Sequence, residues 1–237
     1  MAKRQGAPRK PARAAEPGPV RAVQRAFDLL AHLGDGQPAP TLSALARSSG
    51  LAVSTVARLL AALEHAGFVH RVGAGYEPGT RLVQMGLSAL RRLDVFDLAE
   101  PHLRRLCAAS GETANLATRA DAEHAIYLRQ VVSPKSIHHA SWLGRMLPVA
   151  RTAVGQALAG NVNATGYIAR KNTLEPDVTA IAAPIRGAAG EIAAALSITG
   201  PSYRISEADI RRYGALVAEE ARLASEVLGA RLRAVQQ

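Results

Sequence analysis

The stretch LSALARSSGLAVSTVARLLAALEHAGFVHR, residues 42–71, holds two apolar runs at helical spacing, separated by Gly50 and followed by a strand-like Gly-Phe-Val. In the first run Leu42, Leu45 and Ala46 share one face of a short helix. In the second run the apolar stripe consists of Val56, Leu59, Leu60 and Leu63. The pattern predicts two packed helices joined by a tight glycine-containing turn, which is a helix-turn-helix.

The segments on either side extend this unit. A helix is expected over residues 20–34, where apolar side chains recur at helical spacing and Gly34 supplies the stop; they are Val20, Val23, Phe27 and Leu30. The stretch FVHRVGAGYEPG, residues 68–79, indicates two short strands around a glycine-rich turn. Helix, helix, turn, helix and hairpin is the order of a winged helix-turn-helix over residues 20–79.

The outward face of the third helix is suited to DNA. Ser54, Thr55, Ala57 and Arg58 lie off the apolar stripe. Small side chains let the helix approach a groove closely, hydroxyls contact phosphate or base edges, and arginine contacts guanine with two hydrogen bonds. The alternative is a small helical core with an ordinary charged face, since the spacing alone is only moderately specific.

Charge is concentrated in the first part of the chain. Lys and Arg outnumber Asp and Glu by 13 to 6 in residues 1–94, against 16 to 13 in residues 95–237, and the formal net charge is +10. Residues 1–19 carry five of these basic residues among Pro, Gly and Ala, which is typical of a disordered basic tail. The tail either contacts phosphates non-specifically or acts as a solubilising extension. Double-stranded DNA is the expected partner.

From residue 80 the pattern changes twice. Residues 80–94 are predicted to form a linker helix, and its apolar side chains suggest a seam for a partner chain; they are Leu82, Met85, Leu90 and Leu93. Residues 95–237 are predicted to contain both helices and strands. In chain order we expect a helix over 95–111, two strands within 112–133, a strand candidate at 137–144, a helix within 147–160 and an apolar hairpin over 178–201. A long helix is expected from Ser206, which has capping-box spacing to Asp209. The fold class is α+β, with a sensor-like second domain.

Several function classes receive no support from the sequence. No apolar run is long enough for a membrane span or a signal peptide, so we expect a cytoplasmic protein without a membrane partner. Cys107 is expected to be a core residue, and the adjacent His138 and His139 make a poor chelating pair, so we expect neither metal nor cofactor. The hydroxyls that a catalytic role would require have no motif around them; they are Ser141, Thr152 and Ser197. The other alternative is a DNA-architectural protein, although that function would assign no role to the second domain.

Six segments in this order resemble the IclR family of bacterial transcriptional regulators. They are LARSSGLAVSTVARLLAALEHAGFVHR, GYEPGTRLVQMG, SGETANLA, LPVARTAVGQALAG, GYIARKNTLEPDVTAIAAPI and AALSITGP. The resemblance implies a winged helix-turn-helix, a linker helix and a GAF-like C-terminal domain that binds a small effector, often an organic acid. It also implies homodimers, frequently paired into dimers of dimers, that repress or activate transcription from operator DNA.

The resemblance also implies site residues. DNA contacts fall on Ser54, Thr55, Ala57, Arg58 and, near the wing, Arg71. The effector pocket is lined by Asn115, Trp142, Ala153, Val154, Arg170, Ala180, Ser197 and Thr199. The amides at the start of the helix at Ala153 and Val154, together with the Ser197 and Thr199 hydroxyls, suit a carboxylate.

The chain departs from the family pattern in two places. Residues 161–165 form a much shorter connection than the family's few helices, which puts the closure of the pocket in doubt. After the Gly-Tyr pair the family commonly has acidic residues, whereas this chain has IARKNT. Arg170 and Lys171 would make that wall of the pocket cationic if they point inward, and otherwise they are solvated surface charges.

Overall fold

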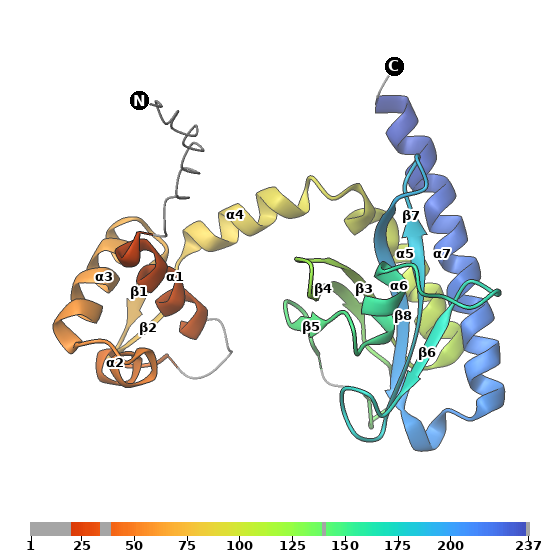
Figure 1. Ribbon diagram of the computed structural model, residues 1–237, viewed down its shortest axis with the longest axis horizontal. Helices are drawn as coiled ribbons and strands as arrows, with labels where there is room; N and C mark the ends of the chain where they lie inside the picture. Colours follow the sequence, from red (N-terminus) through yellow and green to blue (C-terminus); the bar gives the residue numbers. More distant parts are fainter. Residues whose placement is uncertain (1–19, 34–38, 139–140, 236–237) are drawn as a thin grey trace, which may run out of the picture. The chain divides into compact units, whose positions relative to one another are not determined.

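The computed structural model describes residues 20–33, 39–138 and 141–235. The expected tail at residues 1–19, the stop at Gly34 and the side chain of His139 lie outside these ranges. The chain divides into two compact units, residues 1–89 and 90–237 (Figure 1), and the border falls within the expected linker of residues 80–94.

The first unit has the expected element order. Helices α1 (Arg21–Leu33), α2 (Leu42–Ser49) and α3 (Val53–His65) precede strands β1 (Val69–Val72) and β2 (Gly75–Pro78), and α4 (Thr80–Leu90) follows. Thr41 caps α2 by accepting a hydrogen bond from the Ala44 amide at 3.3 Å. Gly50, at φ 67°, ends α2 in the left-handed conformation that glycine adopts without cost.

The helices of this unit enclose one small apolar core. Its buried members come from α1, α2, α3 and β1; they are Leu29, Leu33, Leu45, Ala46, Val56, Leu60 and Val69. Leu59 and Leu63 pack against this core while half-buried. The spacing of Val20, Val23 and Phe27 correctly indicated a helix, but these side chains are 50 to 67% exposed, because α1 turns Leu29 and Leu33 inward.

The hairpin and the fourth helix complete the unit. Strands β1 and β2 pair antiparallel, with Val69 opposite Pro78 and Val72 opposite Gly75. Helix α4 buries no side chain. Of the expected seam, Met85 is exposed while Leu82 and Leu90 are half-buried, and the other strongly exposed apolar residues of α4 are Val83 and Leu87.

The second unit is built on a six-stranded antiparallel sheet in the order β5-β4-β3-β8-β7-β6. The strands are β3 (Thr113–Arg119), β4 (His124–Val131), β5 (Met146–Pro148), β6 (Ile168–Lys171), β7 (Val178–Arg186) and β8 (Ile192–Pro201). The helices are α5 (Asp94–Ser110), α6 (Ala153–Leu158) and α7 (Glu207–Val235), with a 3₁₀ turn η1 (Ser202–Arg204) before α7 (Figure 1). The predicted α+β class is confirmed.

Strand alternation divides this unit into two cores. Along β8, Ala194, Leu196 and Ile198 pack with α5 and α7, whereas Ala195 packs with α6. Because neighbouring strand residues point to opposite faces, Ser197 and Thr199 lie on the α6 side with Ala195. Both faces of β7 and β8 are therefore covered, as their continuous apolar sequence predicted.

One expectation for this unit was wrong. The strand candidate at 137–144 is not a strand in its described residues: Trp142–Arg145 make a turn, with Gly144 at φ 75°, and the edge strand beside β4 is β5 instead. The IARK segment, for which no element was predicted, forms strand β6 along β7. A register fixed by long-range pairing leaves no local signal in four residues.

The short connection at residues 161–165 is a hydrogen-bonded turn. The side-chain oxygen of Asn163 accepts from the amides of Thr165 and Tyr167 and from the Thr165 hydroxyl. The chain thus passes from α6 to β6 without a further helix.

The long C-terminal helix begins as predicted. The Asp209 amide donates to Ser206 Oγ, and the Ser206 amide donates to Asp209 Oδ2, the two bonds of a capping box. Among the described helices, none is both long and apolar enough to cross a membrane.

Candidate functional site

The outward surface of α3 is the first candidate site. Ser54 and Arg58 are exposed, and Thr55 and Ala57 are half-buried, because Val56 and Leu60 on the opposite side occupy the core. The residue that begins the helix, Ala52, has no side chain able to cap the first-turn amides. This end of α3 therefore presents hydroxyls, a guanidinium and small side chains to the solvent.

Arg71 lies on β1, in the hairpin that follows α3. Its Nε donates to the carbonyl oxygen of Gly73 at 3.3 Å, and the residue is exposed. Gly73, at φ 59°, makes the turn between the strands. The predicted DNA-contacting residues thus lie on two consecutive elements of one compact unit.

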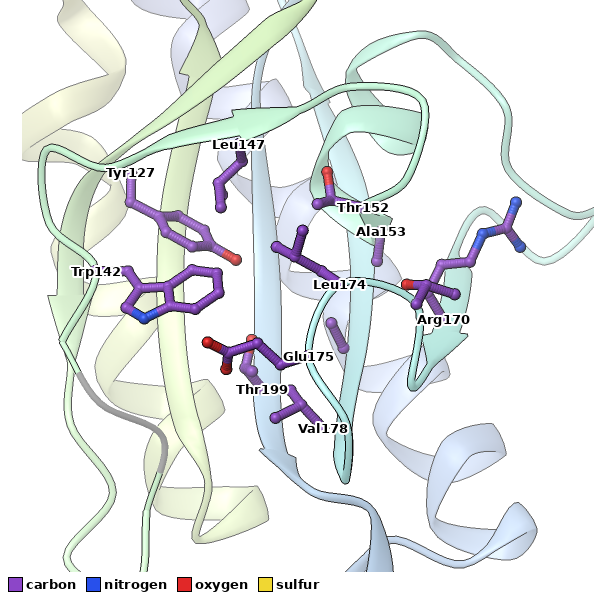
Figure 2. Close-up of a pocket in the computed structure, with 12 residues that line it drawn as sticks. Tyr127, Trp142, Leu147, Thr152, Ala153, Arg170, Leu174, Glu175, Val178 and Thr199 are labelled. Atoms are coloured by element: carbon purple, nitrogen blue, oxygen red, sulfur yellow. The ribbon is translucent and has the colours of Figure 1, made fainter.

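The second candidate site is a cavity in the second unit, of about 40 Å³ (Figure 2). It has room for about three water molecules. The side chains around it come from strands β4 to β8, the turn before β5, the start of α6 and the segment between β6 and β7; they are Tyr127, Trp142, Leu147, Thr152, Ala153, Arg170, Thr173, Leu174, Glu175, Val178, Ala180 and Thr199.

The structure gathers five of the eight predicted pocket residues at this cavity: Trp142, Ala153, Arg170, Ala180 and Thr199. The other three, Asn115, Val154 and Ser197, are buried and are not among the residues that line it. Asn115 supports the wall, since its Nδ2 donates to Thr199 Oγ1 at 3.3 Å and its Oδ1 accepts from Gln130 Nε2 at 2.8 Å.

The charged group that points into the cavity is acidic, whereas Arg170 and Lys171 had suggested a cationic wall. The guanidinium of Arg170 points away from the cavity, whereas the carboxylate of Glu175 points into it, toward Trp142 and Thr199 (Figure 2). Lys171 is exposed. Sequence reasoning missed Glu175 because the acidic residue comes four positions after the strand, in a loop bounded by Asn172 and Asp177, both at positive φ.

Tyr127 was also missed. Burial raises the pKa of its hydroxyl, which therefore stays protonated and able to donate. Its position on β4 shares a face with Ala125, and both residues belong to the α6-side core. The alternation of side chains along β4 could have predicted that Tyr127 lies on the same face as Ala125. Identifying that face as the one with the cavity also required the order of strands in the sheet.

Two local features fix the position of helix α6 beside the cavity. Thr152 Oγ1 accepts from the Gly155 amide at 3.1 Å and donates to the Pro148 carbonyl at 2.9 Å. A Cβ atom at Gly155 would lie 2.3 Å from the Val149 backbone, so only glycine allows this approach. Together they place Ala153 against the cavity.

Candidate metal ligands are not grouped in the part of the chain that the structure describes: no three of its His, Cys, Asp and Glu side chains converge on one point. Cys107 is a buried thiol in the α5-side core, as expected.

Family comparison decides the identity of this two-unit arrangement. The family model of the IclR helix-turn-helix domain matches residues 22–73, and that of the bacterial transcriptional regulator IclR C-terminal domain matches residues 87–162 and 160–226. The chain belongs to the IclR family. The second model matches in two pieces that meet at the short connection after α6, the place where this IclR protein departs from the family pattern.

Individual relatives agree with this assignment. The transcriptional repressor IclR of Escherichia coli strain K12 is 28% identical over 254 residues, covering 90% of this chain and 93% of the relative. The crystal structure of Thermotoga maritima IclR has a TM-score of 0.70 at 24% identity, over 88% of this chain and 99% of that one. An IclR homologue from Microbacterium hydrocarbonoxydans, solved with 4-hydroxybenzoate, has a TM-score of 0.67 at 20% identity, over 85% and 99%. This IclR protein is a ligand-responsive DNA-binding transcriptional regulator.

Proposed function

We propose that this protein binds operator DNA through α3 and the β1–β2 hairpin, as a homodimer or a dimer of dimers, and that a small organic effector in the Glu175 cavity changes its affinity for the operator. The exposed row of Ser54 and Arg58 on α3 carries the DNA part of the proposal. We infer regulation rather than catalysis, since Thr152 is engaged in a helix cap and Ser197 is buried within β8. Action on chromosomal DNA places the protein in the cytoplasm.

Arg58 tests the DNA contact. If it reads a guanine, Arg58→Ala weakens binding to the preferred site by about 1 to 3 kcal/mol and relaxes discrimination at that base pair. Arg58→Lys is the matched variant, because it keeps the positive charge but cannot make the two parallel hydrogen bonds of a guanidinium. Binding of both variants to the preferred and single-mismatch duplexes is measured by fluorescence anisotropy. Equal weakening of Arg58→Ala on every sequence would make Arg58 a phosphate contact.

Exposed apolar side chains on α1 and α4 support the dimer. Val20 just before α1, Val23 and Phe27 on α1, and Val83, Met85 and Leu87 on α4 are each at least 50% exposed. Two recognition helices related by a two-fold axis also read a longer site than one. We expect a dimer or larger in sedimentation at micromolar concentration, and we expect Met85→Glu to weaken it. A monomer that still bound its operator tightly would contradict the proposal.

Glu175 restricts the chemistry of the effector. A bare carboxylate beside it is disfavoured, because two carboxylates that share a site cannot both ionise freely. We therefore narrow the expected organic acid to one with a hydroxyl or amino donor facing Glu175, its carboxylate placed at the Tyr127 hydroxyl instead. The cavity is small for a ligand of one aromatic ring. We propose that the loop of residues 172–177, which carries Leu174 and Glu175, moves to admit such a ligand.

Three probe compounds test this chemistry by thermal shift and calorimetry: 4-hydroxybenzoate, benzoate and 4-hydroxybenzyl alcohol. A ligand that binds only the folded state raises its stability by mass action. We expect the two hydroxylated compounds to bind more tightly than benzoate. Glu175→Gln should reduce that difference by improving the binding of benzoate. Arg170→Ala should leave the selectivity among the three compounds unchanged, because the guanidinium points away from the cavity. Unaltered selectivity in Glu175→Gln would exclude this carboxylate from ligand recognition.

A further inference from the structure

The outward surface at the start of α3 contains two rows of side chains. Residues four apart on a helix are neighbours, so Ser54 lies beside Arg58, and Val53 lies beside Ala57. The first row is polar and the second is apolar. Both rows begin in the first turn of the helix, the part of a recognition helix whose side chains reach base edges.

Packing in the core of the first unit does not account for an apolar side chain at Val53. Its side chain is 51% exposed, and it is neither among the buried residues of the first unit's core nor among those packed against it. Single exposed valines are ordinary at a protein surface. This one, however, has small side chains on two sides, Ala52 before it and Ala57 one turn later, so another surface can approach it closely.

The chemistry of the major groove supplies a matching partner. Thymine is the base that presents a methyl group there, whereas cytosine at the same position presents an amino donor. An apolar side chain packs favourably on this methyl group, which cytosine lacks. From this geometry we infer that Val53, with Ala57, contacts a thymine 5-methyl group and selects thymine over cytosine in each operator half-site.

The two rows together predict a spacing. Val53 and Arg58 are five residues apart, about 7.5 Å along the helix axis. This is about two base-pair steps at 3.4 Å per step. A thymine read by Val53 should therefore lie about two base pairs from the guanine read by Arg58. The inference rests on the proposed binding of operator DNA through α3.

The experiment begins with enrichment of a binding site from a random duplex library by the full-length protein. Each thymine of the enriched site is then replaced singly by deoxyuridine, which removes only the 5-methyl group, and the Kd is measured by fluorescence anisotropy. We expect one position in each half-site where this replacement weakens binding about fourfold, the effect of exposing one buried methyl group.

The variants assign that position to Val53. Val53→Ala should bind the thymine and deoxyuridine duplexes about equally, and Val53→Thr, which keeps one methyl group, should retain part of the difference. Val132→Ala, at an exposed valine of the second unit, is the matched control and should retain all of it. Circular dichroism checks that α3 remains folded, as expected for an exposed site where alanine favours a helix.

The outcomes separate this inference from the function on which it rests. If Val53→Ala keeps the full deoxyuridine effect at every thymine, the inference is overturned while operator binding stands. If no thymine is sensitive in the original protein, the same conclusion follows. If no sequence is enriched from the library, sequence-specific operator binding is overturned, and the inference falls with it.

Discussion

At the scale of single residues, Glu112 has the most deeply buried charged side chain among the described residues of the second unit. Its side chain is 1% exposed, and its carboxylate accepts hydrogen bonds from Lys135 Nζ at 2.7 Å and from Arg204 Nε at 2.8 Å. Burial raises the pKa of this carboxyl, but the bonds from Arg204 and Lys135 outweigh burial and hold the pKa below its usual value. The ionised form is thus the one that the folded state stabilises.

We expect Glu112→Gln to lower the free energy of unfolding by about 2 to 4 kcal/mol at pH 7, since it leaves two cations without their shared counter-charge. Urea unfolding is followed by the fluorescence of Trp142, the single tryptophan, which lies in the second unit. Glu219→Gln, which breaks an exposed pair with Arg222, is the control and should cause no measurable change. An equal loss in both variants would contradict the role given to burial.

The same residue predicts a pH dependence. Because the folded pKa of Glu112 is lowered, its contribution to stability is present above about pH 4.5, the usual pKa, and is lost as the pH falls through the folded value. The stability difference between the original protein and Glu112→Gln should therefore shrink below pH 4.5. A difference that stayed constant down to pH 3 would show that folding does not lower the pKa of Glu112, and would contradict the role given to Arg204 and Lys135.

At the scale of elements, α6 shows how local sequence positions a wall of the cavity. Thr152→Ala removes the cap of this helix and should lower the free energy of unfolding of the second unit by about 1 to 2 kcal/mol. Thr152→Ser keeps the hydroxyl and should lose much less. Thr41→Ala removes the corresponding cap of α2 in the first unit. It should leave the unfolding transition reported by Trp142 unchanged, and a shift of that transition would mean that the two units unfold together.

Sequence reasoning at this scale succeeded where periodicity or a motif was present. The helices and hairpin of the first unit, the hairpin β7–β8 and the capping box at Ser206 were predicted, because each depends on residues within a few positions of one another. It failed at β5, β6 and the inward direction of Glu175, since these follow from pairing and packing with distant strands. Five of the eight residues predicted for an effector pocket line the cavity, but the carboxylate of Glu175 in it was not predicted.

At the scale of the whole molecule, basic charge and DNA recognition are separate properties. The five basic residues within 1–19 add positive charge without a predicted base contact. Deleting residues 1–19 should weaken binding to all duplexes alike and reduce the slope of log K against log salt by about 0.9 for each phosphate that the protein then leaves unneutralised. Anisotropy titrations on enriched and scrambled duplexes at several salt concentrations check this. An altered sequence preference would show that the segment reads bases.

The turn around Asn163 has a consequence for protein engineering. Residues 163–165 are exposed, and the hydrogen bonds that Asn163 makes there satisfy no buried group. A long insertion at such a turn costs little in loop-closure entropy. The turn directly follows α6, which walls the cavity. A circularly permuted fluorescent protein inserted after Ala164 would thus sit one short segment from the effector, and would turn this regulator into an optical biosensor for the compound it detects.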